Sequence, residues 1–331
     1  MLESGVDAER ELMLDFVRVT EAAALRAAYF MGKGTAQAAG KAAADGMIGM
    51  LELVNIDGVI RNPSGKPEFG VLLDYGNRVG KGDGPKFDVV LTPIEGSKLV
   101  ALGLPNALSI FVAARQGSFC IIPTRYVLKL AVGPNAAGHI DLSLPIRDNL
   151  RVIARVLRRK LKHLTVAMLD RPRNESLIKE VQQTGVRIKL ISDGDVAAGL
   201  AAALENTGVD VLYGIGGAME AVVTAAALRC LDGEIQVQPW PASDEEQQML
   251  GIGLHRIYTT EELACGEDMV FCTTGITDGD ILHGVRYFGA KAVTHSMMMR
   301  AKTGTLRIIE TSHNLKKKTL RSQRTGREIP L

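Results

Sequence analysis

The sequence has few cysteines and no long apolar run. Its 331 residues include four cysteines, which form no Cys-x-x-Cys pair and are too few for a disulfide framework. No apolar stretch approaches the ~18–20 residues that cross a bilayer, so we expect no membrane span. The first residues have neither the basic start nor the apolar stretch of a secretory signal. These absences indicate a reducing compartment, either the cytoplasm or an organelle matrix.

The net charge is also small, at +2, but it is unevenly distributed. Residues 314–331 hold one acid, Glu328, and six basic residues, which are Lys316, Lys317, Lys318, Arg321, Arg324 and Arg327. The rest of the chain is therefore net acidic, which argues against a nucleic-acid-binding domain. We interpret the basic tail as a solvated chain end; docking to an anionic partner is the alternative.

The pattern of apolar residues predicts an α/β protein. A helix is expected to follow Asp7, because apolar residues recur there at spacings of three or four, at Leu12, Phe16, Val19 and Ala23. Farther along, three strands alternate with three helices, which predicts a parallel sheet with right-handed crossovers. The strands are expected at residues 164–169, 186–191 and 209–213, and the helices at 175–184, 196–204 and 219–231.

The length suggests two domains. We predict an N-terminal α+β domain over residues 1–150, an α/β domain over 151–313, and the basic tail over 314–331. A further strand is expected at residues 119–122. Residues 233–250, which include Pro239-Trp240-Pro241, are expected to form a connection over the surface.

Each strand of the predicted parallel sheet is followed by residues suited to a polar ligand, and ligands bind beyond the carboxyl ends of such strands. Arg171 and Arg173 follow the first strand and suit phosphate. Asp193 and Asp195 follow the second strand and suit sugar hydroxyls. The third strand is followed by Gly214-Ile215-Gly216-Gly217, whose backbone N–H groups at a helix start favour an anion. Together these segments predict binding of a sugar phosphate.

Each of these segments also has a purely structural interpretation. An arginine pair is common in surface ion pairs, the two aspartates could cap the next helix, and Gly-Gly turns often begin helices. The glycine spacing does not match the GxGxxG pattern of dinucleotide-binding proteins.

The segment Thr92-Pro93-Ile94-Glu95-Gly96-Ser97 follows a predicted strand at residues 87–91. Glu95 on a turn could bind a metal ion, and Ser97 could orient a water molecule. The alternative is a helix start with Glu95 in its first turn.

The chain resembles the class II fructose-1,6-bisphosphatases of bacteria and cyanobacteria over nearly its whole length. The motifs that carry the resemblance are VRVTEA (17–22), DRPR (170–173), ISDGDV (191–196), YGIGGA (213–218), ELACGE (262–267) and TGITDGD (274–280). This family belongs to the lithium-sensitive phosphatase superfamily. The resemblance implies a layered αβαβα sugar-phosphatase fold, with an N-terminal α+β half and a C-terminal βαβ parallel-sheet half.

The resemblance also implies which residues contact the substrate, a sugar bisphosphate. The matching positions are Gly96, Ser97, Tyr126, Arg171, Arg173, Asp193, Asp195 and Gly217. They include the residues that follow the three predicted strands.

The metal ligands implied by the resemblance are only partly present. Glu95 and Glu220 match two acidic ligands, whereas Gly40, Ser64 and Thr92 stand where the family has acids. Glu95 and Ser97 would be the remaining catalytic residues. Metal ions activate water and neutralise charge in phosphoryl transfer, and Mg²⁺ and Mn²⁺ prefer carboxylates. We therefore expect either a weakly held Mn²⁺ or Mg²⁺ ion or none.

These observations predict a class II fructose-1,6-bisphosphatase-like protein that keeps its sugar-phosphate site but is catalytically impaired. It would act as a regulatory or structural homologue, as a homo-oligomer or as a subunit of a larger complex. The alternative is an active metal-dependent fructose-1,6-/sedoheptulose-1,7-bisphosphatase that hydrolyses the 1-phosphate in gluconeogenesis or the Calvin cycle.

Overall fold

The chain divides into two structural units. Unit 1 comprises Met1–Gln116 together with Glu267–Leu331, and unit 2 comprises Gly117–Gly266. The boundary expected between residues 150 and 151 falls inside a helix of unit 2. The computed structural model describes residues 8–62, 73–266, 268–317, 319–321 and 328–330.

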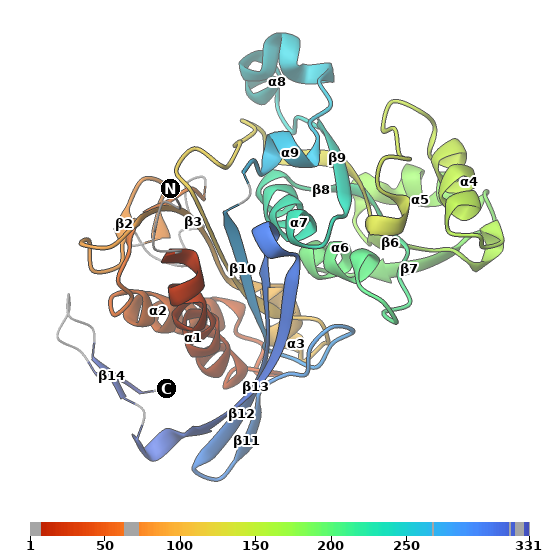
Figure 1. The fold of residues 1–331 in the computed structure, drawn as a ribbon. Helices are drawn as coiled ribbons and strands as arrows, with labels where there is room; N and C mark the ends of the chain where they lie inside the picture. The colour runs from red at the N-terminus through yellow and green to blue at the C-terminus, as the bar shows by residue number, and fades with distance from the viewer. Residues whose placement is uncertain (1–7, 63–72, 267, 318, 322–327, 331) are drawn as a thin grey trace. The chain divides into compact units, whose positions relative to one another are not determined.

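Unit 1 is built on a mixed eight-stranded sheet (Figure 1). Its strands run in the order β11-β12-β10-β4-β3-β1-β2, and β13 pairs with β12. These strands are β1 (Asp57–Ile60), β2 (Arg78–Val79), β3 (Lys86–Glu95), β4 (Leu108–Ala114), β10 (Met269–Gly275), β11 (Arg286–Phe288), β12 (Lys291–Arg300) and β13 (Thr305–Asn314). The helices are α1 (Ala8–Ala28), α2 (Ala36–Leu51) and α3 (Ser97–Leu102), with 3₁₀ turns η7 (Ala301–Thr303) and η8 (Leu315–Lys317).

The predicted N-terminal helix is confirmed as α1, whose apolar face packs on this sheet. Phe16 of α1 is fully buried, and its ring centroid lies 4.8 Å from that of Phe111 on β4 and 6.0 Å from that of Phe87 on β3. The helix buries its predicted positions because their spacing follows the helical repeat. Asp7 lies outside the described residues.

Unit 2 is built on a five-stranded sheet in the order β7-β6-β8-β5-β9. Its strands are β5 (Tyr126–Val132), β6 (Thr165–Leu169), β7 (Arg187–Ile191), β8 (Val211–Gly217) and β9 (Glu234–Pro239). Its α-helices are α4 (Ile146–Val156), α5 (Glu175–Gln182), α6 (Asp195–Ala203), α7 (Ala218–Cys230), α8 (Asp244–Leu250) and α9 (Thr260–Leu263). Its 3₁₀ turns are η3 (Pro134–Ala136), η4 (Leu161–His163), η5 (Pro172–Asn174) and η6 (Gly251–His255). Side chains of α4 and α5 share one core with β5, β6 and β8, and α6 packs against α7.

The βα run is confirmed, but the sheet is mixed rather than all parallel. β6 pairs in parallel with β7 and β8, whereas β5 pairs antiparallel with both β8 and β9. Residues 233–250 are not only a surface connection, because they contain β9 and α8. The strand expected at residues 119–122 is also wrong: Phe119 forms only an isolated bridge with Ala264.

The basic tail, interpreted from the sequence as a solvated chain end, contains a small hairpin. β14 (Thr319–Arg321) pairs antiparallel with β15 (Glu328–Pro330). Three of the basic residues of the tail, Lys318, Arg324 and Arg327, lie outside the described residues.

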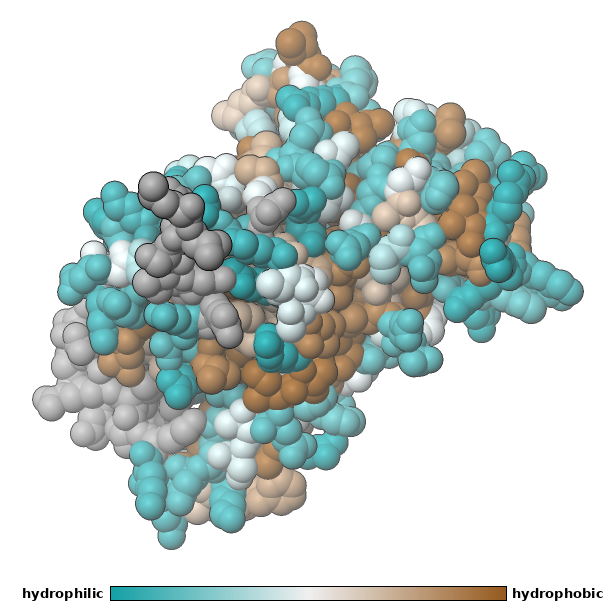
Figure 2. Space-filling view, in the orientation of Figure 1, coloured by the Kyte–Doolittle hydropathy of each residue, from teal (hydrophilic) through white to brown (hydrophobic). Residues whose placement is uncertain are grey.

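On the face drawn in Figure 2, hydrophilic side chains alternate with several apolar areas, one of which lies at the tip of the segment labelled α8 in Figure 1. Met249 and Ile252 are the large exposed apolar residues of this segment. Among the helices that the structure describes, none combines the length and apolar character needed to cross a bilayer.

Candidate functional site

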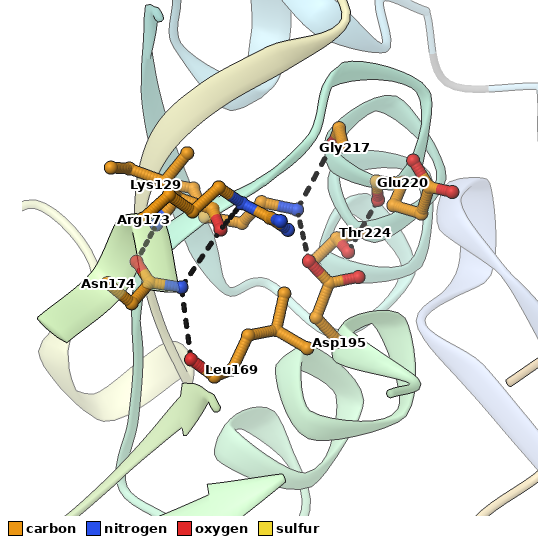
Figure 3. A network of polar contacts seen from close by, with 9 residues as sticks. Lys129, Leu169, Arg173, Asn174, Asp195, Gly217, Glu220 and Thr224 are labelled. Atoms are coloured by element: carbon orange, nitrogen blue, oxygen red, sulfur yellow. Dashed lines mark hydrogen bonds and ion pairs between the residues drawn. The ribbon is translucent and has the colours of Figure 1, made fainter. Parts of the chain in front are cut away.

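The sheet order of unit 2 brings the predicted ligand-binding segments together. β6 lies between β7 and β8, and all three strands are parallel, so their carboxyl ends lie at one edge of the sheet. Residues 170–174 follow β6, residues 192–195 follow β7, and residues 214–217 end β8. The structure therefore brings the arginine, aspartate and glycine segments to a single candidate site, part of which is drawn in Figure 3.

Arg173 crosses from the end of β6 toward β8 and β5. Its Nε donates a hydrogen bond to the carbonyl oxygen of Ile215 at 3.1 Å. Its guanidinium carbon lies 4.3 Å from the centroid of the Tyr126 ring, within the range of a cation–π interaction. Two contacts from two strands thus orient a guanidinium, the group that binds phosphate most specifically.

Asn174, the residue after Arg173, links β6 to β8. Its side chain is fully buried. The Nδ2 group donates to the carbonyl oxygens of Leu169 at 3.0 Å and Ile215 at 3.1 Å, and Oδ1 accepts from the backbone N–H of Ile215 at 2.7 Å. The amide therefore replaces strand pairing at the point where β6 and β8 no longer pair with each other.

Arg171 and Asp193 form the more exposed part of the site. An Nη of Arg171 lies 3.8 Å from Oδ1 of Asp193, and both side chains are about 30% exposed, at 29% and 30%. This long contact leaves a cation and an anion side by side at the surface. A phosphate oxygen could bind the first and a sugar hydroxyl the second.

Asp195 lies in a different environment from Asp193. It is the first residue of α6 and is only 4% exposed. Its Oδ2 accepts a hydrogen bond from Nζ of Lys129 at 2.8 Å, and the same Nζ also donates to the carbonyl oxygen of Gly217 at 3.3 Å (Figure 3). Lys129, on β5, is only 1% exposed. The sequence interpretation identified Asp195 but missed Lys129.

The glycine segment lies within a strand, whereas the sequence analysis placed it after the strand, at the start of a helix. Residues 214–217 are part of β8 and pair with Lys129–Tyr126 of β5 in antiparallel register. That placement was wrong because β5, which the sequence analysis did not identify, pairs with these residues and extends the strand. A Cβ at Gly216 would overlap Oδ2 of Asp195, so only glycine leaves room for the buried pair.

Gly217 ends β8 and forms the N-terminal cap of α7. Glu220 lies in the first turn of α7, and a Cβ at Gly217 would overlap its carboxylate, so the carboxylate lies beside the Gly217 backbone. Acidic residues at this position are stabilised by the positive end of the helix dipole. Glu220 is therefore placed at the same strand end as Tyr126, the register partner of Gly217.

The segment with Glu95 lies in unit 1. Glu95 is the last residue of β3 and is only 6% exposed, so the alternative that placed it in the first turn of a helix is wrong. The register of β3 against β4 shifts between Thr92 and Glu95. Gly96 then adopts a left-handed conformation with φ of 81°, and α3 begins at Ser97.

The implied metal ligands divide between the two units. Glu95 belongs to unit 1 and Glu220 to unit 2. At the other three positions, Gly40 is buried in α2 without a side chain, Thr92 offers a hydroxyl, and Ser64 lies outside the described residues. Within the ranges that the structure describes, no group of three or more His, Cys, Asp or Glu side chains could hold a metal ion. Each of the two glutamates supplies a carboxylate, the kind of donor through which Mg²⁺ binds together with water and a substrate phosphate.

Comparison with known proteins identifies the family of the chain. Residues 10–313 match the family described as "Bacterial fructose-1,6-bisphosphatase, glpX-encoded". Over 325 residues the chain is 40% identical to "Fructose-1,6-bisphosphatase 1 class 2" of Escherichia coli strain K12, which covers 93% of this chain and 97% of that relative. It is similar to the same extent to "Fructose-1,6-bisphosphatase class 2" of Escherichia coli O6:H1 and of Shigella flexneri. The chain therefore belongs to the bacterial class II fructose-1,6-bisphosphatase family.

Proposed function

We propose that the chain binds a sugar bisphosphate such as fructose 1,6-bisphosphate through the strand ends of unit 2 and releases phosphate from it with Mn²⁺ or Mg²⁺ as cofactor. Family membership supports the reaction. The observation that carries the binding is Arg173, whose guanidinium is fixed by Ile215 and by the Tyr126 ring. Asp193, at the end of the adjacent strand, supplies an acceptor for sugar hydroxyls.

Arg173→Ala tests this function. We expect the unchanged protein to release phosphate from fructose 1,6-bisphosphate in the presence of Mn²⁺ at about 1 per second or faster, within the usual enzyme range. Arg173→Ala should lower kcat/KM at least about tenfold, because a charge-assisted phosphate contact is lost. Arg155→Ala, at an exposed arginine of α4, is the matched control and should leave kcat/KM unchanged. Equal loss in both variants would contradict a specific role for Arg173.

A second candidate function is sugar-bisphosphate binding with little or no hydrolysis, as a regulatory or structural homologue. The observation that favours it is the absence of acidic side chains at positions 40, 64 and 92, where the resemblance implies metal ligands. This candidate predicts turnover far below 1 per second together with measurable binding. The combined substitutions Gly40→Asp, Ser64→Glu and Thr92→Asp should then raise the rate, whereas single substitutions should not, because metal ligands act as a unit. Turnover above about 1 per second in the unchanged protein would rule the second candidate out.

Comparison of the kcat/KM values for fructose 1,6-bisphosphate and sedoheptulose 1,7-bisphosphate determines which of the two is the preferred substrate. We propose a cytoplasmic location, since the named relatives are bacterial proteins. We also propose that the chain forms a homo-oligomer, which light scattering on the purified protein would test.

A further inference from the structure

We infer that Lys129 is a positioning residue for the sugar-phosphate site, and that Asp195 is its buried partner rather than a carboxylate that faces the ligand. This inference rests on the proposed binding of a sugar bisphosphate by unit 2. It assigns different roles to Asp193 and Asp195, which the sequence interpretation treated alike.

The burial of both charged groups carries the first step. Lys129 is 1% exposed and Asp195 4% exposed, and their charged atoms lie 2.8 Å apart. A buried charge without a partner is strongly unfavourable, so each group holds the other in place. Burial of Asp195 and the bond of its Oδ2 to Lys129 limit the access of a ligand hydroxyl to this carboxylate, whereas the side chain of Asp193 is 30% exposed.

The pair connects the elements that form the site. Lys129 extends from β5, Asp195 begins α6, and the second hydrogen bond of the Lys129 ammonium ends on Gly217, where β8 meets α7. Gly217 is the register partner of Tyr126, the ring on which Arg173 stacks. Lys129 thus bonds to elements that carry the residues proposed to bind the ligand, and its 1% exposure argues that it is not one of them.

The absence of a side chain at Gly216 leaves room for the pair formed by Lys129 and Asp195. A Cβ at this position would overlap Oδ2 of Asp195 and lie 2.8 Å from Nζ of Lys129. Because both atoms are buried, they have little room to move aside. The alternative is that Lys129 and Asp195 only fill space in the core. That alternative does not by itself explain why the Lys129 ammonium also donates to the carbonyl oxygen of Gly217, at the end of β8.

The experiment compares binding and stability in matched variants. Fructose 1,6-bisphosphate binding is measured by isothermal titration calorimetry, and stability by thermal unfolding of the ligand-free protein. Lys129→Met alone should lower both, since it leaves Asp195 buried and unpaired. Lys129→Met combined with Asp195→Asn removes both charges at nearly constant volume. It should recover most of the lost melting temperature but still bind at least about tenfold more weakly than the unchanged protein.

Two further variants complete the test. Lys162→Met removes an exposed lysine from η4, just before the start of β6 and so at the opposite end of that strand, and should leave binding unchanged. Gly216→Ala should weaken binding without removing a charge, because its methyl group pushes the pair apart. This variant tests the positioning role even if the variants at Lys129 and Asp195 fail to fold.

The outcomes separate the two proposals. Wild-type affinity in the double variant or in a cooperatively folded Gly216→Ala variant would overturn the positioning role and leave the proposed function intact. Failure of the unchanged protein to bind fructose 1,6-bisphosphate would overturn the proposed function and, with it, this inference.

Discussion

Tyr213 places a titratable phenol in the core of unit 2. It lies on β8 and is 6% exposed. Burial raises its pKa from 10.0 to about 12, with a smaller contribution from the negative charge of Glu180. The folded state therefore favours the neutral phenol, whereas in the unfolded chain the phenol ionises near pH 10. The resulting stabilisation is complete below pH 10 and is lost as the pH rises from about 10 to 12.

Tyr213→Phe tests this dependence. The free energy of unfolding of the unchanged protein, relative to that of the variant, should fall by about 2 kcal/mol between pH 9.5 and 11.5. Urea unfolding at several pH values gives the free energy of unfolding of each protein. The difference between the two free energies removes the contribution of lysines, which titrate in the same pH range in both proteins. Parallel pH curves for the two proteins would contradict the buried-phenol account.

The residues of the site differ in how far the sequence could predict them. Arg173 and Asp193 were predictable because they follow strands of a βα run, where the fold itself places ligands. Lys129 had no local signal: it is a charged residue within an apolar strand, and its partner Asp195 is 66 positions away. Asn174 was missed for the same reason, since its partner Ile215 is 41 positions away.

At the scale of elements, the side chain of Asn174 links the ends of β6 and β8 through hydrogen bonds to Leu169 and Ile215. Asn174→Ala should lower the free energy of unfolding by about 2–4 kcal/mol, because buried backbone groups of both strands lose their partner. It should also weaken sugar-bisphosphate binding, since Arg173 is the adjacent residue. Asn149 is a matched control: it is 3% exposed, and its side chain accepts from Asp141 N–H and donates to the Asp141 carbonyl.

Asn149→Ala should therefore cost a similar amount of stability without weakening binding once the lower melting temperature is taken into account. Chemical unfolding and calorimetric titration of the two variants give the comparison. If both variants bind as the unchanged protein does, Asn174 supports only the fold.

Two strands, β5 and β9, were not predicted from the sequence, and the structure shows why. β9 alternates buried and half-buried residues, as a strand should, but Gly233 and the Pro239-Trp240-Pro241 run indicated a loop. β5 pairs with β8 and β9, both of which come much later in the chain. Long-range pairing of this kind is decided by tertiary packing, which local patterns do not contain.

At the scale of the whole molecule, unit 2 is a continuous segment whose two ends are paired. Phe119 bridges Ala264, and the backbone N–H of Cys265 donates to the carbonyl oxygen of Ser118 at 2.8 Å. Segments with adjacent ends and their own core can fold independently. We therefore expect a chain of residues 117–266 to unfold cooperatively and to bind fructose 1,6-bisphosphate.

A fragment of residues 151–313, the domain boundary predicted from the sequence, is the matched comparison. It lacks β5 and therefore Lys129 and Tyr126, so we expect no cooperative unfolding and no binding. Circular dichroism during thermal unfolding distinguishes the two fragments. Cooperative unfolding of 151–313 alone would support the sequence-based boundary instead.

The sequence of unit 2 lies between the two segments of unit 1. During translation, unit 1 can therefore complete its fold only after the whole of unit 2 has been synthesised. All seven residues of β4 are buried, and their pairing on one side depends on β10, which ends at Gly275. At 5–20 residues per second, β10 is translated about 10–30 s after β4. During that interval the nascent chain exposes an apolar strand edge, while unit 2 can already fold. We therefore expect Leu108–Ala114 to make newly synthesised chains vulnerable to aggregation until β10 has been translated.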